Sequence, residues 1–111
     1  AYEIASHFQS LGVPVIMGGI HATMCTAEAS EHVDCVVTGE AEGVWAEVLS
    51  DIEQGRLKPL YEGGLADVSQ IRPARHDLLP RDYVFGAIQT TRGCPLGCNF
   101  CSVTKKSTNP M

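Results

Sequence analysis

The fold of this chain is decided by two short apolar runs, Val13-Pro14-Val15-Ile16-Met17 and Asp34-Cys35-Val36-Val37-Thr38. Each run is short and rich in β-branched residues, which favours a buried strand over a helix. Glycine follows each run directly, as Gly18-Gly19 and as Gly39. Because glycine interrupts regular structure, the two runs predict two short strands that each end at a glycine turn.

Helical patterns flank the two predicted strands. Residues 1–11 place Ile4, Phe8 and Leu11 at helical spacing, and Thr26 is predicted to cap a short helix over 27–32. A third helix, ended by Gly55, carries the apolar residues Val44, Trp45, Val48, Leu49 and Ile52. Trp45 is expected in the core. The alternation of helix and strand predicts an α/β fold, a partial Rossmann-like parallel sheet with flanking helices.

The pattern changes after residue 58. Prolines punctuate residues 59–83, and Gly63-Gly64 is expected to break any strand near Tyr61, although part of this segment could pair as an edge strand. Residues 59–83 are therefore interpreted mainly as a linker. Val84 to Thr91 regains β character. The predicted organisation is an α/β part over 1–58, a linker over 59–83, and the start of a second domain over 84–111.

The second part carries the stretch Cys94-Pro95-Leu96-Gly97-Cys98-Asn99-Phe100-Cys101. Three thiolates at C-x3-C-x2-C spacing can hold one face of a metal cluster. Because a [4Fe–4S] cluster has four irons, three protein sulfurs leave one iron without a protein ligand. Structural zinc is the alternative, but zinc favours four protein ligands and no histidine or second cysteine pair lies nearby. An iron–sulfur cluster is therefore favoured over zinc.

Composition narrows the class of protein. The 111 residues are 44% hydrophobic and 19% charged, with a net charge of −5, which argues against a nucleic-acid-binding module. The sequence contains no run of 18 or more apolar residues, so no transmembrane helix is expected. Five cysteines, three of them clustered, do not form the even pattern of a secreted disulfide protein, so a reducing, cytoplasmic setting is expected. Cys25 and Cys35 are expected in or near the core.

The cysteine stretch, with Thr90-Thr91-Arg92-Gly93 before it, resembles the signature of the radical S-adenosylmethionine superfamily. The resemblance implies that Cys94, Cys98 and Cys101 ligate a [4Fe–4S] cluster whose open iron binds S-adenosylmethionine. It also implies that Phe100 lies near that cofactor, and that a reducing electron donor protein supplies electrons to the cluster. The second domain would then be the first strand and cluster loop of a radical S-adenosylmethionine barrel.

The upstream half resembles the later strands of the cobalamin-binding domain that precedes many such enzymes. The resemblance rests on Met17-Gly18-Gly19-Ile20-His21-Ala22-Thr23 and on Val36-Val37-Thr38-Gly39-Glu40. Both glycine turns follow predicted parallel strands, so both fall at the carboxyl edge, where open α/β sheets bind ligands. The resemblance assigns five residues to the cobalamin rim: Gly18, Gly19, His21, Gly39 and Glu40. Two of these residues also have simpler roles. His21 could be a hydrogen-bonded loop histidine, and Glu40 could interact with the N-terminus of the next helix.

Together these resemblances predict a fragment of a cobalamin-dependent radical S-adenosylmethionine enzyme. The branch expected is the oxidative cyclase that acts on a small tetrapyrrole, magnesium-protoporphyrin IX monomethyl ester. Carbon methyltransferases and methylthiotransferases of the same superfamily are the alternatives. A binding module from a different class, an α/β domain with a structural zinc site, is also open. The fragment by itself is expected to be inactive, because it lacks the barrel that would surround the cluster.

Overall fold

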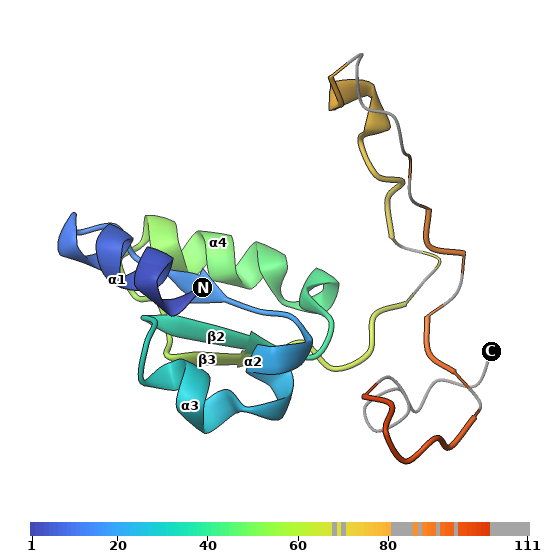
Figure 1. Ribbon diagram of the computed structural model, residues 1–111. Coiled ribbons are helices and arrows are strands. Elements are labelled where there is room, and N and C mark those ends of the chain that lie inside the picture. The colour runs from blue at the N-terminus through green and yellow to red at the C-terminus, as the bar shows by residue number, and fades with distance from the viewer. Residues whose placement is uncertain are drawn as a thin grey trace. The chain divides into compact units, whose positions relative to one another are not determined.

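A computed structural model describes residues 1–67, 69, 71–80, 86, 88–90, 92–94 and 96–102 (Figure 1). The chain divides into two compact units, Ala1–Asp67 and Val68–Met111, and each is described by itself. Among the described residues, no helix is both long enough and apolar enough to cross a membrane.

The first unit is built on a three-stranded parallel sheet. The strands β1 (Ile16–Met17), β2 (Cys35–Thr38) and β3 (Leu60–Glu62) lie in the order β1-β2-β3. β2 is central and pairs in parallel with both neighbours. This arrangement confirms the predicted α/β class, because the first two strands form where the apolar runs predict them and are joined through helices.

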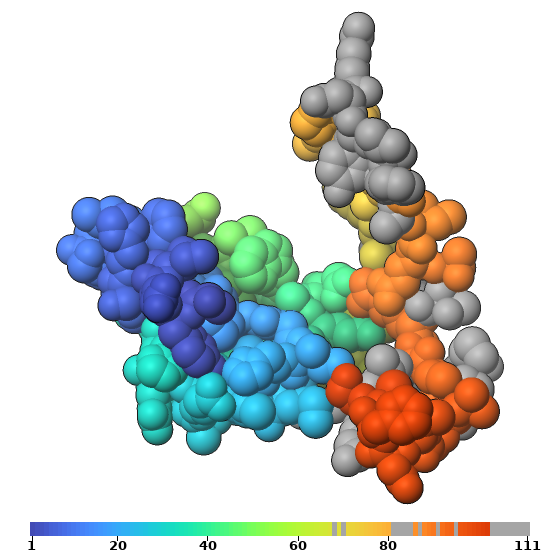
Figure 2. Space-filling view, viewed as in Figure 1, coloured from blue at the N-terminus to red at the C-terminus, as the bar shows by residue number. Residues whose placement is uncertain are grey.

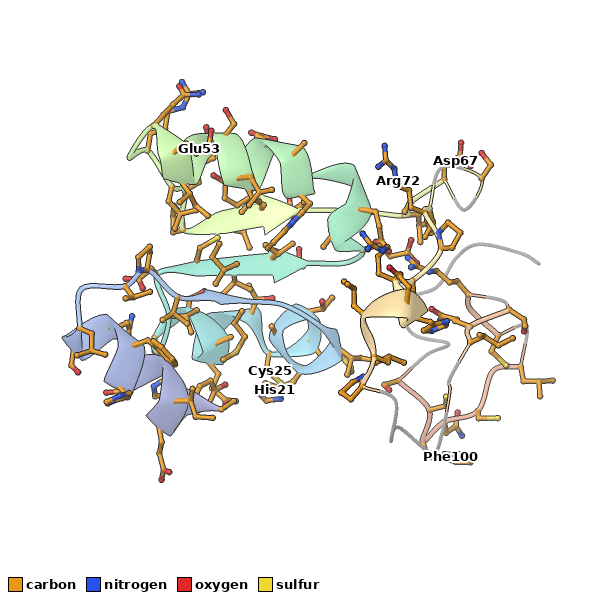
Figure 3. The ribbon with its side chains drawn as sticks, turned by 90° about the horizontal axis from the view of Figure 1, so that it is seen from above. His21, Cys25, Glu53, Asp67, Arg72 and Phe100 are labelled. Carbon is orange, nitrogen blue, oxygen red and sulfur yellow. The ribbon has the colours of Figure 1, made fainter. Side chains whose placement is uncertain are left out.

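Helices cover both faces of this sheet. They are α1 (Tyr2–Ser10), α2 (Ile20–Met24), α3 (Thr26–Ser30) and α4 (Trp45–Glu53), with a 3-10 turn at Ala41–Gly43. In Figure 2 the dark blue residues of α1 lie directly against the lighter blue and cyan residues of α2 and α3. Figure 3 shows these three helices on one side of the strands and α4 on the other.

The central strand sends alternate side chains into two cores, as strand geometry requires. On one face, Val36 packs with residues of the first three helices and the following turn: Ala5, Ala22, Ala29 and Val33. On the other face, Cys35 and Val37 pack with Val48 and Tyr61. Both faces of β2 are therefore covered, which is typical of parallel sheets. The core position of Cys35, which is 0% exposed, is as predicted.

The third strand lies where the sequence predicts the start of a linker. β3 pairs Leu60 with Val36 and Tyr61 with Val37, and the first compact unit continues to Asp67. Tyr61 is only 4% exposed, so this strand adds its aromatic ring to the core. Gly63-Gly64 ends the strand rather than preventing it. The structure thus extends the α/β part beyond residue 58.

Two helical details differ from the prediction. A short helix, α2, precedes the predicted one, and α3 includes Thr26, whose hydroxyl donates to the carbonyl of Ala22 at 2.9 Å rather than capping α3. The expectation that Trp45 lies in the core is wrong, because its side chain is 44% exposed. Trp45 begins α4, and Val48, one turn later, is the fully buried residue of that helix.

A polar cluster ties the end of α4 to β3. The Tyr61 hydroxyl donates to Asp51 Oδ2 at 2.7 Å, and Arg56 Nε donates to Asp51 Oδ1 at 2.7 Å. The side chain of Asp51 is 5% exposed. The hydrogen bond from Tyr61, supported by Arg56, outweighs burial and holds the pKa of the Asp51 carboxyl below its usual value. Burial, supported by Asp51, raises the pKa of the Tyr61 phenol.

The second unit contains little regular structure in its described part. A 3-10 turn, His76–Leu78, follows Arg75, whose guanidinium donates to the Asp77 carboxylate at 2.7 and 2.6 Å. The strand predicted over 84–91 depends on Val84, Phe85, Ala87 and Thr91, which lie outside the described residues, so it stays a prediction.

Candidate functional site

All three strands end at glycine turns on one edge of the sheet. β1 is followed by Gly18-Gly19, β2 by Gly39 and β3 by Gly63-Gly64. Because the strands are parallel, these turns meet at the carboxyl edge, as the sequence predicts for the first two. Open α/β sheets bind ligands at this edge. We therefore call these turns and Glu40 the carboxyl-edge cluster.

The turns after β2 and β3 are held against each other by backbone contacts. The Glu40 N–H donates to the Gly64 carbonyl at 3.1 Å, and the Gly63 N–H donates to the Thr38 carbonyl at 2.8 Å. Gly39 has a φ of +71°, and a Cβ there would lie 2.8 Å from the Gly64 carbonyl oxygen. A Cβ on Gly63 would lie 1.9 Å from the Glu40 carbonyl oxygen. Glycine is thus required here by packing.

Glu40 takes part in the same contact. Its carboxylate oxygen Oε2 accepts the backbone N–H of Ala66 at 2.7 Å. The residue is half-buried, and its side chain fixes the segment that follows β3. This contact joins Glu40 to the segment that follows β3.

The turn after β1 is more open. A Cβ on Gly18 would make ordinary contact with the Val37 carbonyl at 3.5 Å, whereas a Cβ on Gly19 would meet nothing within 4 Å. Gly19 has a φ of +92°, which L side chains rarely adopt. Its backbone conformation therefore favours glycine, while the space beside it could admit a ligand.

Thr23 links the two turns and was missed by the sequence analysis. Its hydroxyl donates to the Gly19 carbonyl at 2.8 Å and accepts the Gly39 N–H at 3.1 Å. Thr23 is only 9% exposed and lies in α2. A threonine four residues after a glycine turn was the available signal, since a Thr hydroxyl in a helix often bonds to the carbonyl four residues earlier.

His21 does not contact the other assigned rim residues through its ring. Its Nε2 lies 2.9 Å from the Tyr2 hydroxyl and 3.5 Å from Glu28 Oε1. Figure 3 shows His21 and Cys25 together on the side of α2 that faces away from the strands. The structure thus gathers four of the five assigned rim residues at the carboxyl edge and gives the fifth side chain different partners.

The cysteine loop lies in the second unit. Cys94, Cys98 and Cys101 are each half-buried, and none of the five cysteines, all in the described part of the chain, forms a disulfide. The Cys101 N–H donates to the Cys98 carbonyl at 3.1 Å, which closes a turn between these two. Gly93 enters the loop with a φ of +90°. Phe100 is 93% exposed.

The donor set of this loop fits an iron–sulfur cluster. Thiolates are the protein ligands that such clusters use, and three of them lie within eight residues on a turning backbone. The loop offers neither a histidine nor a fourth cysteine within its described residues, so its donor set is less suited to structural zinc. The assignment of these three ligands and of Phe100 stays a prediction.

Comparison with known proteins relates the chain to methyltransferases. It is 38% identical over 110 residues to bacteriochlorophyllide d C-8(2)-methyltransferase of Chlorobaculum tepidum, a match covering 91% of this chain and 24% of the relative. It is 36% identical over 115 residues to bacteriochlorophyllide d C-12(1)-methyltransferase of the same organism, covering 92% of the chain and 24% of the relative.

A third relative is an uncharacterised methyltransferase of Pyrococcus horikoshii, 33% identical over 129 residues, covering 92% of the chain and 28% of the relative. The chain thus spans about a quarter of the length of the curated relatives it matches. Because the first match covers 91% of the 111 residues, the matched region includes the glycine turns and all three loop cysteines. No family model and no solved structure matches the chain.

Proposed function

We propose that this chain is the junction between a cobalamin-binding domain and a radical S-adenosylmethionine domain in a longer enzyme that methylates a tetrapyrrole carbon. The observation that carries the proposal is the similarity to two bacteriochlorophyllide d methyltransferases across the stretch that holds the three cysteines. The parallel sheet with its glycine turns supports the first half, and the thiol donor set supports the second.

The comparisons favour methyl transfer over the cyclase expected from the sequence. Both relatives with a named substrate are methyltransferases, which corresponds to the carbon methyltransferase alternative. Their names also support a tetrapyrrole as the class of small-molecule substrate. The cyclase activity on magnesium-protoporphyrin IX monomethyl ester has no support from these relatives, and neither does methylthiolation.

In this proposal the loop cysteines bind and orient a [4Fe–4S] cluster. When bound, such a cluster with one open iron supplies the electron that cleaves S-adenosylmethionine, and it receives that electron from a reducing donor protein. The turn from Cys98 to Cys101 places two thiolates close along the chain, while Cys94 follows the bend at Gly93. Phe100, which is exposed, is available to cover the bound cofactor.

The carboxyl-edge cluster would face cobalamin mainly through Gly18 and Gly19. The space beside Gly19 is open, whereas Gly39 and Glu40 are in contact with the turn after β3. We therefore expect a bulky substitution at Gly19 to reduce cobalamin retention by the full-length protein. A matched bulky substitution at Gly12, which also has positive φ and open space but ends α1, should leave retention unchanged. Equal retention in both variants contradicts the rim assignment.

The decisive experiment uses the full-length protein that contains this chain, reconstituted anaerobically with iron and sulfide. We expect about four irons per chain, cleavage of S-adenosylmethionine to 5′-deoxyadenosine, and methyl transfer to a bacteriochlorophyllide. Replacing Cys94, Cys98 and Cys101 by alanine should abolish cluster and cleavage. Cys25→Ser, which removes a thiol outside the loop, should leave both intact.

Three outcomes contradict the proposal. A triple alanine variant that still cleaves S-adenosylmethionine excludes the loop as the cluster site. One equivalent of zinc without iron in the anaerobically prepared protein favours the binding module with a structural zinc site instead. Ring closure of magnesium-protoporphyrin IX monomethyl ester without methyl transfer would restore the cyclase interpretation.

A further inference from the structure

We infer that His21, Cys25 and Glu28 form a binding site for a divalent transition metal ion of the zinc class. Their donor atoms, a ring nitrogen, Sγ and a carboxylate oxygen, all lie within 4.8 Å of one another. His21 is in the first turn of α2, Cys25 lies between α2 and α3, and Glu28 is in the first turn of α3. The site belongs to the first unit and goes beyond the proposed function.

The helical spacing explains why these three donors meet. His21 and Cys25 are four residues apart, and Glu28 follows three residues later, so all three lie on one face of consecutive helices. The backbone bends at Cys25, where φ is −121° and ψ is 49°. Figure 3 shows His21 and Cys25 on the side of α2 that faces away from the strands. His21 and Glu28 are exposed and Cys25 is half-buried, so an ion can reach them from solvent.

The distances are close to those a bound ion needs. Zinc bonds of about 2.0–2.3 Å at tetrahedral angles place neighbouring ligand atoms roughly 3.3–3.8 Å apart. His21 Nε2 and Glu28 Oε1 already lie 3.5 Å apart. Their side chains are 57% and 53% exposed, so small rotamer changes can bring Sγ of Cys25 to the same separation.

Tyr2 provides the outer support that metal ligands commonly have. Its hydroxyl donates to Glu28 Oε1 at 2.9 Å and also lies 2.9 Å from His21 Nε2, a contact that a bound ion would replace. Tyr2 therefore orients the carboxylate, and α1 is tied to the site.

The donor set selects the class of metal. One nitrogen, one sulfur and one oxygen suit a borderline ion such as zinc, and three protein ligands leave the fourth tetrahedral position to water. Binding replaces the S–H bond of Cys25 by an S–metal bond and releases one proton to solvent, with no change of oxidation state. The bound ion would join α2 to α3 across their bend.

The test uses the whole 111-residue chain with Cys94, Cys98 and Cys101 replaced by serine, so that the cysteine loop cannot bind metal. We expect one equivalent of Co²⁺ to bind at neutral pH with a thiolate-to-cobalt charge-transfer band, and Zn²⁺ to displace it. Cys25→Ser should remove the band, and His21→Gln and Glu28→Gln should each weaken binding at least tenfold. His7→Gln, the matched control, changes a histidine outside the site and should bind as the background chain does.

A second readout needs no substitution at Cys25. In the same background, Zn²⁺ should slow alkylation of Cys25 at least tenfold, and a chelator should restore the rate; Cys35 is fully buried and reacts little. The inference is overturned by a background chain that binds no Co²⁺, by a charge-transfer band that survives Cys25→Ser, or by alkylation that Zn²⁺ does not slow. None of these results bears on the iron–sulfur cluster, because its ligands are absent from this background.

Discussion

The carboxyl-edge cluster and the cysteine loop differ in how much of their sequence is explained by folding. At the sheet edge, Gly39 and Gly63 are required because two backbone segments touch there. In the loop, three half-buried cysteines form no disulfide. A glycine motif at the sheet edge is therefore weak support for a cofactor, while the clustered thiols are strong support.

The largest expected effect separates metal binding from folding. Replacing Cys94, Cys98 and Cys101 together by serine should remove nearly all iron from the reconstituted full-length protein, because thiolates are the cluster ligands. The same triple substitution in the 111-residue chain should leave the urea midpoint of the first unit unchanged, followed by far-UV circular dichroism. A midpoint that falls by as much as it does for a core substitution would show that the cysteines serve the fold.

The next effect concerns two neighbouring glycines. Gly63→Ala places a Cβ against the Glu40 carbonyl, so the two turns must separate, and we expect a loss of about 3 kcal/mol or more in the free energy of unfolding. A Cβ on Gly64 would lie in open space, so Gly64→Ala should lower the free energy of unfolding only through the strain of its φ of +64°, by about 1–2 kcal/mol. Urea unfolding of both variants measures the difference, and equal losses would mean that the close approach is not what requires glycine.

A smaller effect is the pH dependence of stability, which is set by the polar cluster of Asp51, Tyr61 and Arg56 between α4 and β3. The pKa of Asp51 is lower in the folded chain than its unfolded value of about 3.9, so the folded state is favoured above that value. This stabilisation is lost as the pH falls through the folded pKa. Unfolding between pH 5 and about 2 should therefore become easier in the wild-type chain, and Asp51→Asn should flatten this dependence.

The pH dependence of stability has the opposite sign at Tyr61, because the pKa of its phenol is higher in the folded chain. Its stabilisation is present below the unfolded value of about 10 and is lost as the pH rises through the folded pKa. Tyr61→Phe should remove that alkaline loss. If both variants keep the pH profile of the wild-type chain, the contact between α4 and β3 does not control stability.

The smallest expected effect is that of Phe100→Ala. Because this side chain is 93% exposed, the free energy of unfolding should change by less than about 0.5 kcal/mol. In the full-length protein the same substitution should weaken S-adenosylmethionine binding if Phe100 covers that cofactor. Unchanged binding, measured by calorimetry, would remove Phe100 from the site while leaving the cysteines in place.

The sequence predicts well what local patterns determine. The strands at Ile16–Met17 and Cys35–Thr38 and the helix that ends before Gly55 form where the apolar runs and glycines indicate. Trp45 was assigned to the core because apolar residues fill a wide stripe of α4, but only part of that stripe faces the sheet. Val48 occupies the buried position, and Trp45 lies at its margin.

What escaped the sequence analysis depends on partners far along the chain. β3 was open only as an edge strand, because it has one buried residue, Tyr61, and its pairing with β2 across more than twenty residues leaves no local period. Thr23 connects two turns, and His21 meets Tyr2 nineteen residues away. Such contacts can be seen only in the folded chain. The cysteine spacing, by contrast, predicts a cluster site from eight consecutive residues.

The most direct test of the central claim is Mössbauer spectroscopy of the full-length protein reconstituted with ⁵⁷Fe under strict exclusion of oxygen. Three protein thiolates should leave one iron of the [4Fe–4S] cluster distinct, and addition of S-adenosylmethionine should shift the signal of that iron alone. A spectrum in which all irons respond alike, or in which S-adenosylmethionine changes nothing, would contradict the assignment of Cys94, Cys98 and Cys101.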